Sequence, residues 1–444
     1  MPLEMAGRNA KKTRRRILFS PSQDGTKTAP LGAAVIGAGY WGKKVISEYL
    51  AAERNGDVRL LKVCDPSIAS LGSLLITKET HSIDQSRLTQ DISEVMQDPD
   101  ISAVHIATPN PTHYSLAKMA LESGKNVLVE KPMALTSRES FELVKLAKSR
   151  GLVIHVGHVF RFNAALRVGR EILKKGDLGR LFYIRIQWTD QASFPERDII
   201  FDLGPHPFDI LNQLLSAWPT RVSGITRGYR GDRGEVAYVI AEFPNGVFAH
   251  IELSWLHPSK AREVTVVGSK GSLSVDCLKQ EVFLITPDAK TGVPVSSSNT
   301  IQSEIQNFID SIMWRDVSSR SGVIGARTVE ALESVRLSMW DRRLPVIEKA
   351  QQLSGGFVVD LLQRVKNRRL EQSRFENELD LERYMGILVK SGLLKRVSGE
   401  TDFPYELTEN GSVFMQAYGE VVENGLEAMP VLEVAQEQPT KNDF

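Results

Sequence analysis

Cysteine is scarce in this sequence, with only Cys64 and Cys277 among 444 residues. Both lie in apolar, strand-like surroundings, so we expect buried thiols rather than a disulfide. The 8 histidines are scattered, and no group of Cys and His has the spacing of metal ligands. The sequence therefore predicts neither a metal centre nor a disulfide-stabilised scaffold.

The sequence also lacks a long apolar run and an excess of one charge. No stretch approaches the roughly 20 apolar residues that span a bilayer, and no apolar secretory segment follows the basic N-terminus. A formal net charge of +1 gives no general attraction to nucleic acid or to a membrane. We therefore predict a cytoplasmic protein without a membrane partner.

The composition and hydrophobic pattern of the sequence predict three folded domains between two disordered ends. Residues 1–30 form a polar, basic tail containing KKTRRR, for which contact with nucleic acid or membrane is the alternative. Residues 31–152 alternate strand and helix patterns, which indicates a doubly wound parallel sheet of the Rossmann type. The last disordered stretch is residues 426–444.

The other two folded parts have different patterns. In residues 153–347, long segments alternate apolar and polar residues and are joined by the turns PNG and SKG. This indicates an α+β domain with a large antiparallel sheet, followed by helix from about residue 301 to 342. Residues 355–425 return to short helices and strands and form a third, small domain.

Three glycines interrupt the chain directly after an apolar strand, in AAVIGAGYWGKKV. Gly37, Gly39 and Gly42 form G-x-G-x-x-G between that strand and an amphipathic helix. The first glycine permits a tight turn, the second lets the backbone approach a pyrophosphate, and the third lets helix and strand pack closely. An ordinary glycine turn is the alternative. We assign Tyr40 and Trp41 to the same predicted dinucleotide site.

The second predicted strand ends at Asp65. A carboxylate at this place can accept hydrogen bonds from both ribose hydroxyls of a dinucleotide and repels a 2′-phosphate. No arginine follows Asp65 in the sequence DPS. The cofactor expected is therefore NAD rather than NADP.

Two further strands end in polar or turn residues. One ends in Thr108 and Pro109, and the next ends in Glu130 and Lys131. Because the carboxyl ends of parallel strands face the ligand crevice, all four are assigned to the cofactor site, with Lys131 pointing toward the nicotinamide. A surface lysine beside a proline turn is the alternative. His113, at a helix start near the crevice, is a further cofactor candidate.

At this point the chain resembles the Gfo/Idh/MocA family of nucleotide-dependent oxidoreductases, over about residues 31–347. The resemblance rests on GAGYWG, ATPNPTH, EKP, GDLGRL and DLGPHPFDIL, in that order. It implies a dinucleotide-binding domain and a substrate and dimerisation domain with a large open antiparallel sheet. It also implies activity on hydroxyl or carbonyl groups of sugars, inositols or nucleotide sugars. GYWG and SWLHPSKAREVTVVGSKG look most like the nucleotide-sugar dehydrogenase branch.

The resemblance carries the family's catalytic residues onto Lys131, Asp202 and His206. If the chain is helical from about Asp202, the last two share a helix face. Oxidising a secondary alcohol requires a base for the hydroxyl proton, and His206 has a suitable ordinary pKa. Lys131 can hydrogen-bond the same oxygen and stabilise negative charge there. Asp202 can orient the imidazole or bind a neighbouring hydroxyl.

Five further side chains are candidates for substrate contact. Lys260 and Arg262 suit a diphosphate, with a solvated hairpin end as the alternative. Asp209 suits a hydroxyl network or a local cap. The full set of substrate candidates is Arg161, Asn163, Asp209, Lys260 and Arg262.

The segment 355–425 resembles winged-helix domains of microbial regulators. Its amphipathic helix contains Leu381, Tyr384, Leu388 and Val389, and a strand pair is expected around Tyr405. The segment contains nine Lys and Arg against twelve Asp and Glu, a net charge of −3. This balance disfavours DNA binding without excluding it, because such binding depends on neutralising phosphates. We expect a docking or dimerising module and a homo-oligomer.

The favoured function is an NAD-dependent dehydrogenase or reductase acting on a sugar-like hydroxyl group. One alternative is a catalytically silent, dinucleotide-sensing regulator that uses the winged-helix segment. Intact Lys131, Asp202 and His206 argue against it, since a sensor does not need them. The other alternative is a hydrolase or lyase that uses bound NAD transiently and releases no net NADH.

Overall fold

The computed structural model describes most of the chain between residues 30 and 340. The described ranges are 30–192, 197–230, 234–314 and 320–340, with short pieces at 362–363, 365–366, 385, 388–389, 392–397, 405–413 and 415. The tails predicted at residues 1–30 and 426–444 lie outside them, apart from residue 30. No helix in these ranges is both long enough and apolar enough to cross a membrane.

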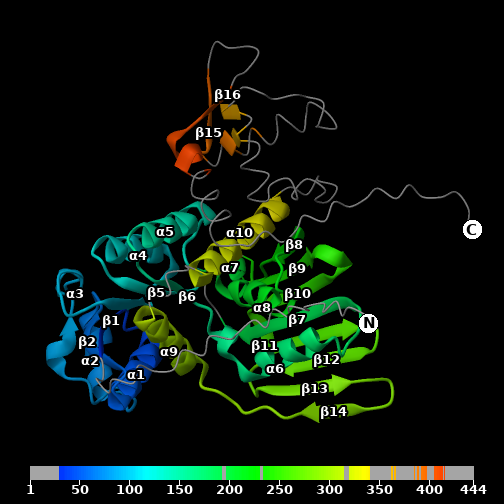
Figure 1. Ribbon diagram of the computed structural model, residues 1–444, viewed down its shortest axis with the longest axis horizontal. Coiled ribbons are helices and arrows are strands. Elements are labelled where there is room, and N and C mark those ends of the chain that lie inside the picture. The colour runs from blue at the N-terminus through cyan, green and yellow to red at the C-terminus, as the bar shows by residue number, and fades with distance from the viewer. Residues whose placement is uncertain are drawn as a thin grey trace, which may run out of the picture. The chain divides into compact units, whose positions relative to one another are not determined.

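The first domain is a parallel six-stranded sheet in the order β3-β2-β1-β4-β5-β6 (Figure 1). Strand β1 and the interior of β5 are continuous apolar runs and β4 is buried throughout, as expected where helices cover both faces. The strands are β1 (Leu31–Ile36), β2 (Val58–Cys64), β3 (Leu88–Thr89), β4 (Ala103–Ile106), β5 (Asn126–Glu130) and β6 (Ile154–Gly157). The helices are α1 (Tyr40–Asn55), α2 (Ile68–Ile76), η1 (Gln85–Arg87), α3 (Ser93–Met96), η2 (Asn110–Thr112), α4 (His113–Glu122) and α5 (Ser137–Ser149). The predicted Rossmann arrangement is confirmed.

The second domain is an eight-stranded sheet in the order β14-β13-β12-β11-β7-β10-β9-β8. Its strands are β7 (Leu181–Gln191), β8 (Arg221–Arg227), β9 (Val236–Glu242), β10 (Phe248–Ser254), β11 (Leu256–Gly268), β12 (Gly271–Asp276), β13 (Glu281–Ile285) and β14 (Lys290–Val293). The PNG turn is η4 (Pro244–Gly246), between β9 and β10. The SKG turn joins β11 to β12.

The expectation of a purely antiparallel second sheet is wrong at one pair, because β7 and β10 run parallel. The physical reason lies in the connection between them. After β7 the chain forms two helices before it enters the β8-β9-β10 meander, so β10 returns beside β7 in the same direction. The sheet is therefore mixed.

Further helices pack against the second sheet or join it to the first domain. They are η3 (Val159–Phe162), α6 (Ala164–Lys175), α7 (Ile199–Leu203), α8 (Pro205–Leu215), α9 (Thr300–Met313) and α10 (Arg320–Trp340). On α9, Ile305, Phe308 and Ile309 join the hydrophobic core formed with β1, β2 and α1. Helix α10 packs against both α5 and β8, as Figure 1 shows. The predicted helix after residue 301 is thus two helices that hold the domains together.

Both cysteines are free and buried, as expected. Burial raises the pKa of Cys64 to about 11 and raises the pKa of Cys277 further. Neither thiol is therefore placed to act as a thiolate nucleophile near neutral pH.

The described part of the C-terminal segment contains one strand pair, β15 (Leu394–Arg396) and β16 (Tyr405–Leu407), which is antiparallel. The expected strand around Tyr405 is therefore present. Leu388 is buried, whereas Leu381 and Tyr384 lie outside the described residues. The winged-helix resemblance stays a prediction.

Candidate active site

The glycine loop after β1 has the geometry that a dinucleotide requires. Gly37 has a φ of +104°, and a Cβ on Gly42 would lie 2.1 Å from the Gly37 carbonyl oxygen. A Cβ on Gly39 would meet nothing within 4 Å. The first and third glycines are thus fixed by turn and packing, while the second faces open space, where a pyrophosphate can approach. No side chain caps the first turn of α1, so its N–H groups are available to phosphate oxygens.

Asp65 lies directly beyond β2, beside this loop. Its Oδ2 accepts a hydrogen bond from the Ala38 amide at 2.7 Å, and its Oδ1 accepts one from the Ser67 amide at 2.8 Å. These bonds fix the carboxylate at the end of the strand. Each oxygen keeps a further acceptor site, which suits the ribose hydroxyls of NAD.

Beyond β4, His113 is part of the loop architecture. Its Nδ1 lies 2.8 Å from the Pro132 carbonyl oxygen and its Nε2 lies 2.8 Å from that of Thr108. Burial lowers the pKa of His113, and the two carbonyls oppose that shift. Since both ring nitrogens are engaged inside the protein, the expectation of direct contact with the nicotinamide is not supported. Instead, His113 ties the loop after β5 to the end of β4.

Glu130, at the end of β5, is also turned inward. Its Oε1 accepts a hydrogen bond from Trp41 Nε1 at 2.5 Å and lies 3.3 Å from His105 Nε2. Burial alone would raise the pKa of Glu130, but the bonds from His105 and Trp41 and the charge of Lys131 lower it. Glu130 therefore holds the first turn of α1 against the sheet. Glu130 thus positions the first turn of α1, which is part of the predicted cofactor site.

Lys131 and Asp202 meet across the two domains. The Lys131 ammonium donates to the Asp202 carbonyl oxygen at 2.7 Å and lies 3.5 Å from Asp202 Oδ1. The guanidinium of Arg197 lies 3.4 Å from the same Oδ1. Lys131 is therefore directed at the second domain. It is not a surface lysine beside a proline turn.

His206 follows Asp202 on the next helical segment. The expected single helix is two consecutive segments, α7 with Asp202 and α8 with His206, and Gly204 between them keeps helical angles. The His206 ring lies edge-on to Phe160, with ring centres 5.0 Å apart, and 5.6 Å from the centre of Trp188. Two aromatic rings therefore flank the candidate base.

The electrostatics of His206 favour the neutral imidazole. Burial lowers the pKa of His206 well below its ordinary value, and the positive charges of Lys131 and Arg262 lower it further. The buried Nδ1 has no hydrogen-bond partner among the described residues. A neutral imidazole beside a lysine can accept a proton from a hydroxyl group that the lysine binds.

The half-buried Arg161 and the buried Asp209 form an ion pair rather than two free polar contacts. Arg161 Nε donates to Asp209 Oδ1 at 2.5 Å, and its NH2 group donates to Asn212 Oδ1 at 2.7 Å. Asn163 caps α6 through the Leu166 amide and donates to the Cys277 carbonyl oxygen at 2.8 Å. Each side chain has a structural partner, so direct substrate contact by these three stays a prediction.

Lys260 and Arg262 share one carboxylate on the facing strand. Lys260 Nζ lies 3.0 Å and Arg262 NH2 lies 3.5 Å from Asp190 Oδ2. Lys260 is largely exposed, whereas the Arg262 guanidinium is buried over the Trp188 ring, 5.0 Å from its centre. Of the two, only Lys260 has the exposure that a diphosphate contact needs.

Sequence reasoning missed four side chains around His206. Phe160 and Trp188 flank its ring, Arg197 contacts Asp202, and His158 is buried beside Asp209. The first two lie in ordinary apolar patterns, so only the fold distinguishes them. Among the described residues, no three or more His, Cys, Asp and Glu side chains group in a way that could hold a metal ion.

Comparison with known protein families identifies the family of this chain. The model of the oxidoreductase family with an NAD-binding Rossmann fold matches residues 31–158, and the Gfo/Idh/MocA C-terminal domain matches residues 166–274. The chain belongs to the Gfo/Idh/MocA family. It is therefore an oxidoreductase whose first domain binds NAD, as the glycine loop indicates.

Similar proteins act on sugars and cyclic polyols. The chain is 27% identical over 254 residues to UDP-N-acetylglucosamine 3-dehydrogenase of Acidithiobacillus ferrooxidans, a match covering 54% of this chain and 79% of that enzyme. It is 31% identical over 206 residues to scyllo-inositol 2-dehydrogenase (NAD(+)) of Bacillus subtilis, covering 44% of this chain and 60% of that enzyme.

A solved structure has the same fold. It is an inositol dehydrogenase homologue of Azotobacter vinelandii, complexed with NADH and myo-inositol. It superposes with a TM-score of 0.62 over 70% of this chain and 96% of that chain, at 18% identity.

Proposed function

We propose that this chain transfers hydride between NAD and a carbon bearing a hydroxyl or carbonyl group, in a sugar, nucleotide sugar or cyclic polyol. The observation that carries the proposal is the contact of Lys131, at the carboxyl end of the NAD-binding sheet, with Asp202 of the second domain, with His206 four residues further on and close enough for the charge of Lys131 to lower its pKa. The nucleotide-sugar and inositol dehydrogenases among its relatives support the substrate class.

Each of the three residues has a role that follows from its surroundings. Neutral His206 accepts the proton of the substrate hydroxyl group during oxidation and returns it during reduction. Lys131 donates a hydrogen bond to the same oxygen and stabilises its developing negative charge. Asp202 holds Lys131 in place and accepts hydrogen bonds from a neighbouring substrate hydroxyl. When bound, NAD supplies the hydride acceptor, and NADH supplies the donor.

The protein environment supports this chemistry by limiting water near the base. Phe160 and Trp188 present ring carbons to His206. A site with low polarity strengthens the hydrogen bond from Lys131 and keeps the imidazole unprotonated. The preference for NAD over NADP rests on Asp65, whose fixed carboxylate repels a 2′-phosphate.

The decisive experiment measures NADH formation with a panel of nucleotide sugars, hexoses and inositols. We expect net NADH with at least one of them. His206→Ala lowers turnover ~10² to 10⁴-fold, the usual contribution of a general base, while NAD affinity stays unchanged. His250→Ala is the matched control, since His250 stacks on Tyr238 in the second sheet, with ring centres 6.0 Å apart.

Three results would contradict the proposal in different ways. Substrate consumption without net NADH would favour a hydrolase or lyase that recycles its cofactor. NAD binding without turnover of any panel member would favour a sensor. Unchanged turnover in the His206 variant would give that residue a structural role.

A homo-oligomer is part of the same proposal. The second sheet exposes Tyr183 and Phe248, which stack with ring centres 5.8 Å apart, and Tyr238 and Ile240 nearby. An apolar sheet face of this kind suits a second copy of the chain. Light scattering should give at least twice the monomer mass, and Tyr183→Glu should shift it toward the monomer. A monomeric wild-type protein would refute this part.

A further inference from the structure

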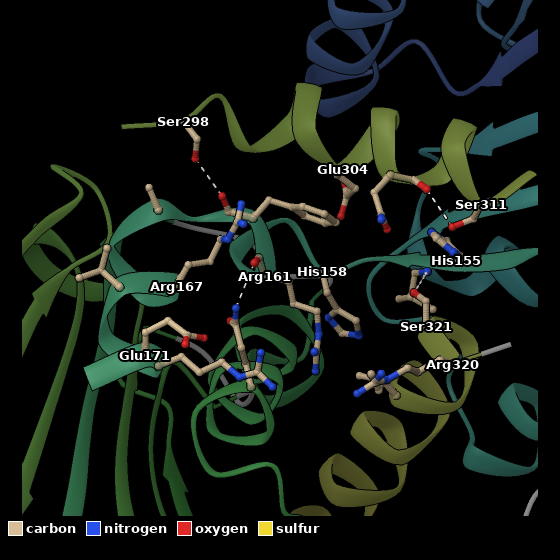
Figure 2. Close-up of a pocket in the computed structure, with 18 of the residues that line it drawn as sticks. His155, His158, Arg161, Arg167, Glu171, Ser298, Glu304, Ser311, Arg320 and Ser321 are labelled. Carbon is tan, nitrogen blue, oxygen red and sulfur yellow. Dashed lines mark hydrogen bonds between the residues drawn. The ribbon is translucent and has the colours of Figure 1, made fainter. Parts of the chain in front are cut away.

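A large cleft lies along β6, the edge strand of the NAD-binding sheet. Its volume is about 1080 Å³, and α6, α9 and the start of α10 line it (Figure 2). Lys131, Asp202 and His206 are not among its lining residues. The cleft therefore has a different lining from the proposed catalytic centre, and His158, which lines the cleft, lies close enough to His206 to influence its pKa.

The floor of the cleft contains buried polar groups without partners. Glu304 is 2% exposed and His158 is 2% exposed. Both Glu304 oxygens and both His158 ring nitrogens lack a hydrogen-bond partner, as does Gln213 Oε1. Figure 2 shows Glu304 pointing from α9 into the cleft, on the side where His158 lies. Buried polar groups are almost always hydrogen-bonded, so these groups are arranged to receive a ligand or water.

The protonation states of these groups suit hydroxyl groups. Burial raises the pKa of Glu304 well above its ordinary value, and the carboxylates of Glu130 and Asp209 raise it further. Burial also lowers the pKa of His158. A protonated carboxyl and a neutral imidazole each donate and accept one hydrogen bond, as does a sugar hydroxyl.

The mouth of the cleft is basic. Arg167, Arg170, Lys175 and Arg320 all line it, and none of them forms an ion pair within the described residues. Their one acidic neighbour at the mouth, Glu171, pairs with Lys174 at 2.8 Å. Guanidinium groups bind carboxylate and phosphate oxygens in pairs.

We propose that this cleft is a second ligand site, for a small hydroxylated organic anion such as a phosphorylated or carboxylated sugar. The hydroxyl groups bind to Glu304, His158 and Gln213, and the anionic group binds to the arginines of α6. The site spans β6 of the NAD-binding domain and α6 of the second domain.

Calorimetric titration of the full chain, saturated with NAD, tests the proposal. D-Glucose 6-phosphate represents the phosphorylated class and D-gluconate the carboxylated class, with D-glucose and inorganic phosphate as the two partial ligands. We expect at least one of the two sugar anions to bind about tenfold more tightly than either partial ligand, since charge-assisted hydrogen bonds add to those of the hydroxyls. Arg167→Ala should weaken this binding about tenfold.

Two exposed lysines provide a matched control. Lys175 lines the cleft and Lys270, in the turn between β11 and β12, does not, so Lys175→Ala should weaken binding and Lys270→Ala should leave it unchanged. The proposal is overturned if neither sugar anion binds more tightly than glucose and phosphate. It is also overturned if both lysine variants bind alike, or if His206→Ala abolishes binding while Arg167→Ala does not.

Substitution of Glu304 separates binding from folding. Glu304→Leu removes an unpartnered buried carboxyl, so it should raise the melting temperature while abolishing binding of the sugar anion. Glu304→Gln keeps a neutral group that donates and accepts, so it should retain binding. A Leu variant that binds as the wild type does would exclude Glu304 from any ligand site.

Discussion

Glu333 offers a quantitative test of the junction between the two domains. It lies on α10, and its Oε2 accepts a hydrogen bond from the Ser137 amide, at the start of α5, at 3.1 Å. Burial raises the pKa of Glu333 to about 7 from an ordinary value of 4.5. Since each pKa unit corresponds to about 1.4 kcal/mol, ionising Glu333 in the folded protein costs about 3 kcal/mol relative to the unfolded chain.

The sign of the pH dependence follows from the raised pKa. The folded protein holds the Glu333 proton more tightly than the unfolded chain does. The stability that the folded protein gains from holding this proton is therefore fully present below a pH of about 4.5, and it is lost as the pH rises through about 7. Glu333→Gln keeps an acceptor for the Ser137 amide without the charge, so the variant should be about 3 kcal/mol more stable than the wild type above pH 8.

Urea denaturation at mildly acidic and mildly alkaline pH measures this difference. The wild type should lose stability between the two conditions by more than the Gln variant does. Glu330→Gln is the control, since Glu330 lies on the same helix and pairs with Arg327 at 2.6 Å. Equal pH dependence in the wild type and the Glu333 variant would refute the argument that this carboxyl is held neutral at the junction.

Three further predictions concern the cofactor and the C-terminal segment. Asp65→Ala should weaken NAD binding and reduce the difference in affinity between NAD and NADP. A wild-type protein that binds NADP more tightly than NAD in calorimetric titration would contradict this prediction. Gly42→Ala should lower both the melting temperature and NAD affinity, because its Cβ would lie 2.1 Å from the Gly37 oxygen, whereas Gly39→Ala should lower NAD affinity alone. Truncation after Lys349 should preserve NAD binding but change the mass in light scattering or the stability; salt-sensitive DNA binding lost on truncation would favour a regulator.

Local patterns were sufficient to predict the NAD-binding half of the molecule. The spacing of Gly37, Gly39 and Gly42 is sufficient for the prediction, because all three glycines act within one strand–turn–helix unit. They permit the tight turn, the approach of the backbone to a pyrophosphate, and the close packing of helix and strand. Asp65 and Lys131 lie directly after β2 and β5, as expected, and parallel strands bring their carboxyl ends to one edge of the sheet. For these residues the sequence position determines the spatial position.

Partnerships between distant segments could not be predicted in the same way. Arg161 binds Asp209, and Arg262 binds Asp190 over the Trp188 ring, through contacts that only the finished fold creates. The inward turn of His113 depends on carbonyl groups from two loops. The parallel pairing of β7 and β10 depends on the path of the chain through α7 and α8, which lie between β7 and the β8-β9-β10 meander. The alternation of apolar and polar residues within a strand does not determine that path.

The placement of unpartnered polar atoms links stability to function in this protein. Among the described residues, such atoms include His206 Nδ1, both ring nitrogens of His158, Asp209 Oδ2, Gln213 Oε1 and both side-chain oxygens of Glu304. Each buried polar group without a partner costs about 1–3 kcal/mol, and a folded protein has only about 5–15 kcal/mol in total. The chain cannot tolerate all of these costs at once, so the groups must find partners in water, cofactor or ligand. A core selected for stability alone would contain apolar side chains at these positions. The presence of such groups beside Lys131 and in the cleft along β6 therefore supports the two proposals that polar molecules bind at the catalytic centre and in the cleft.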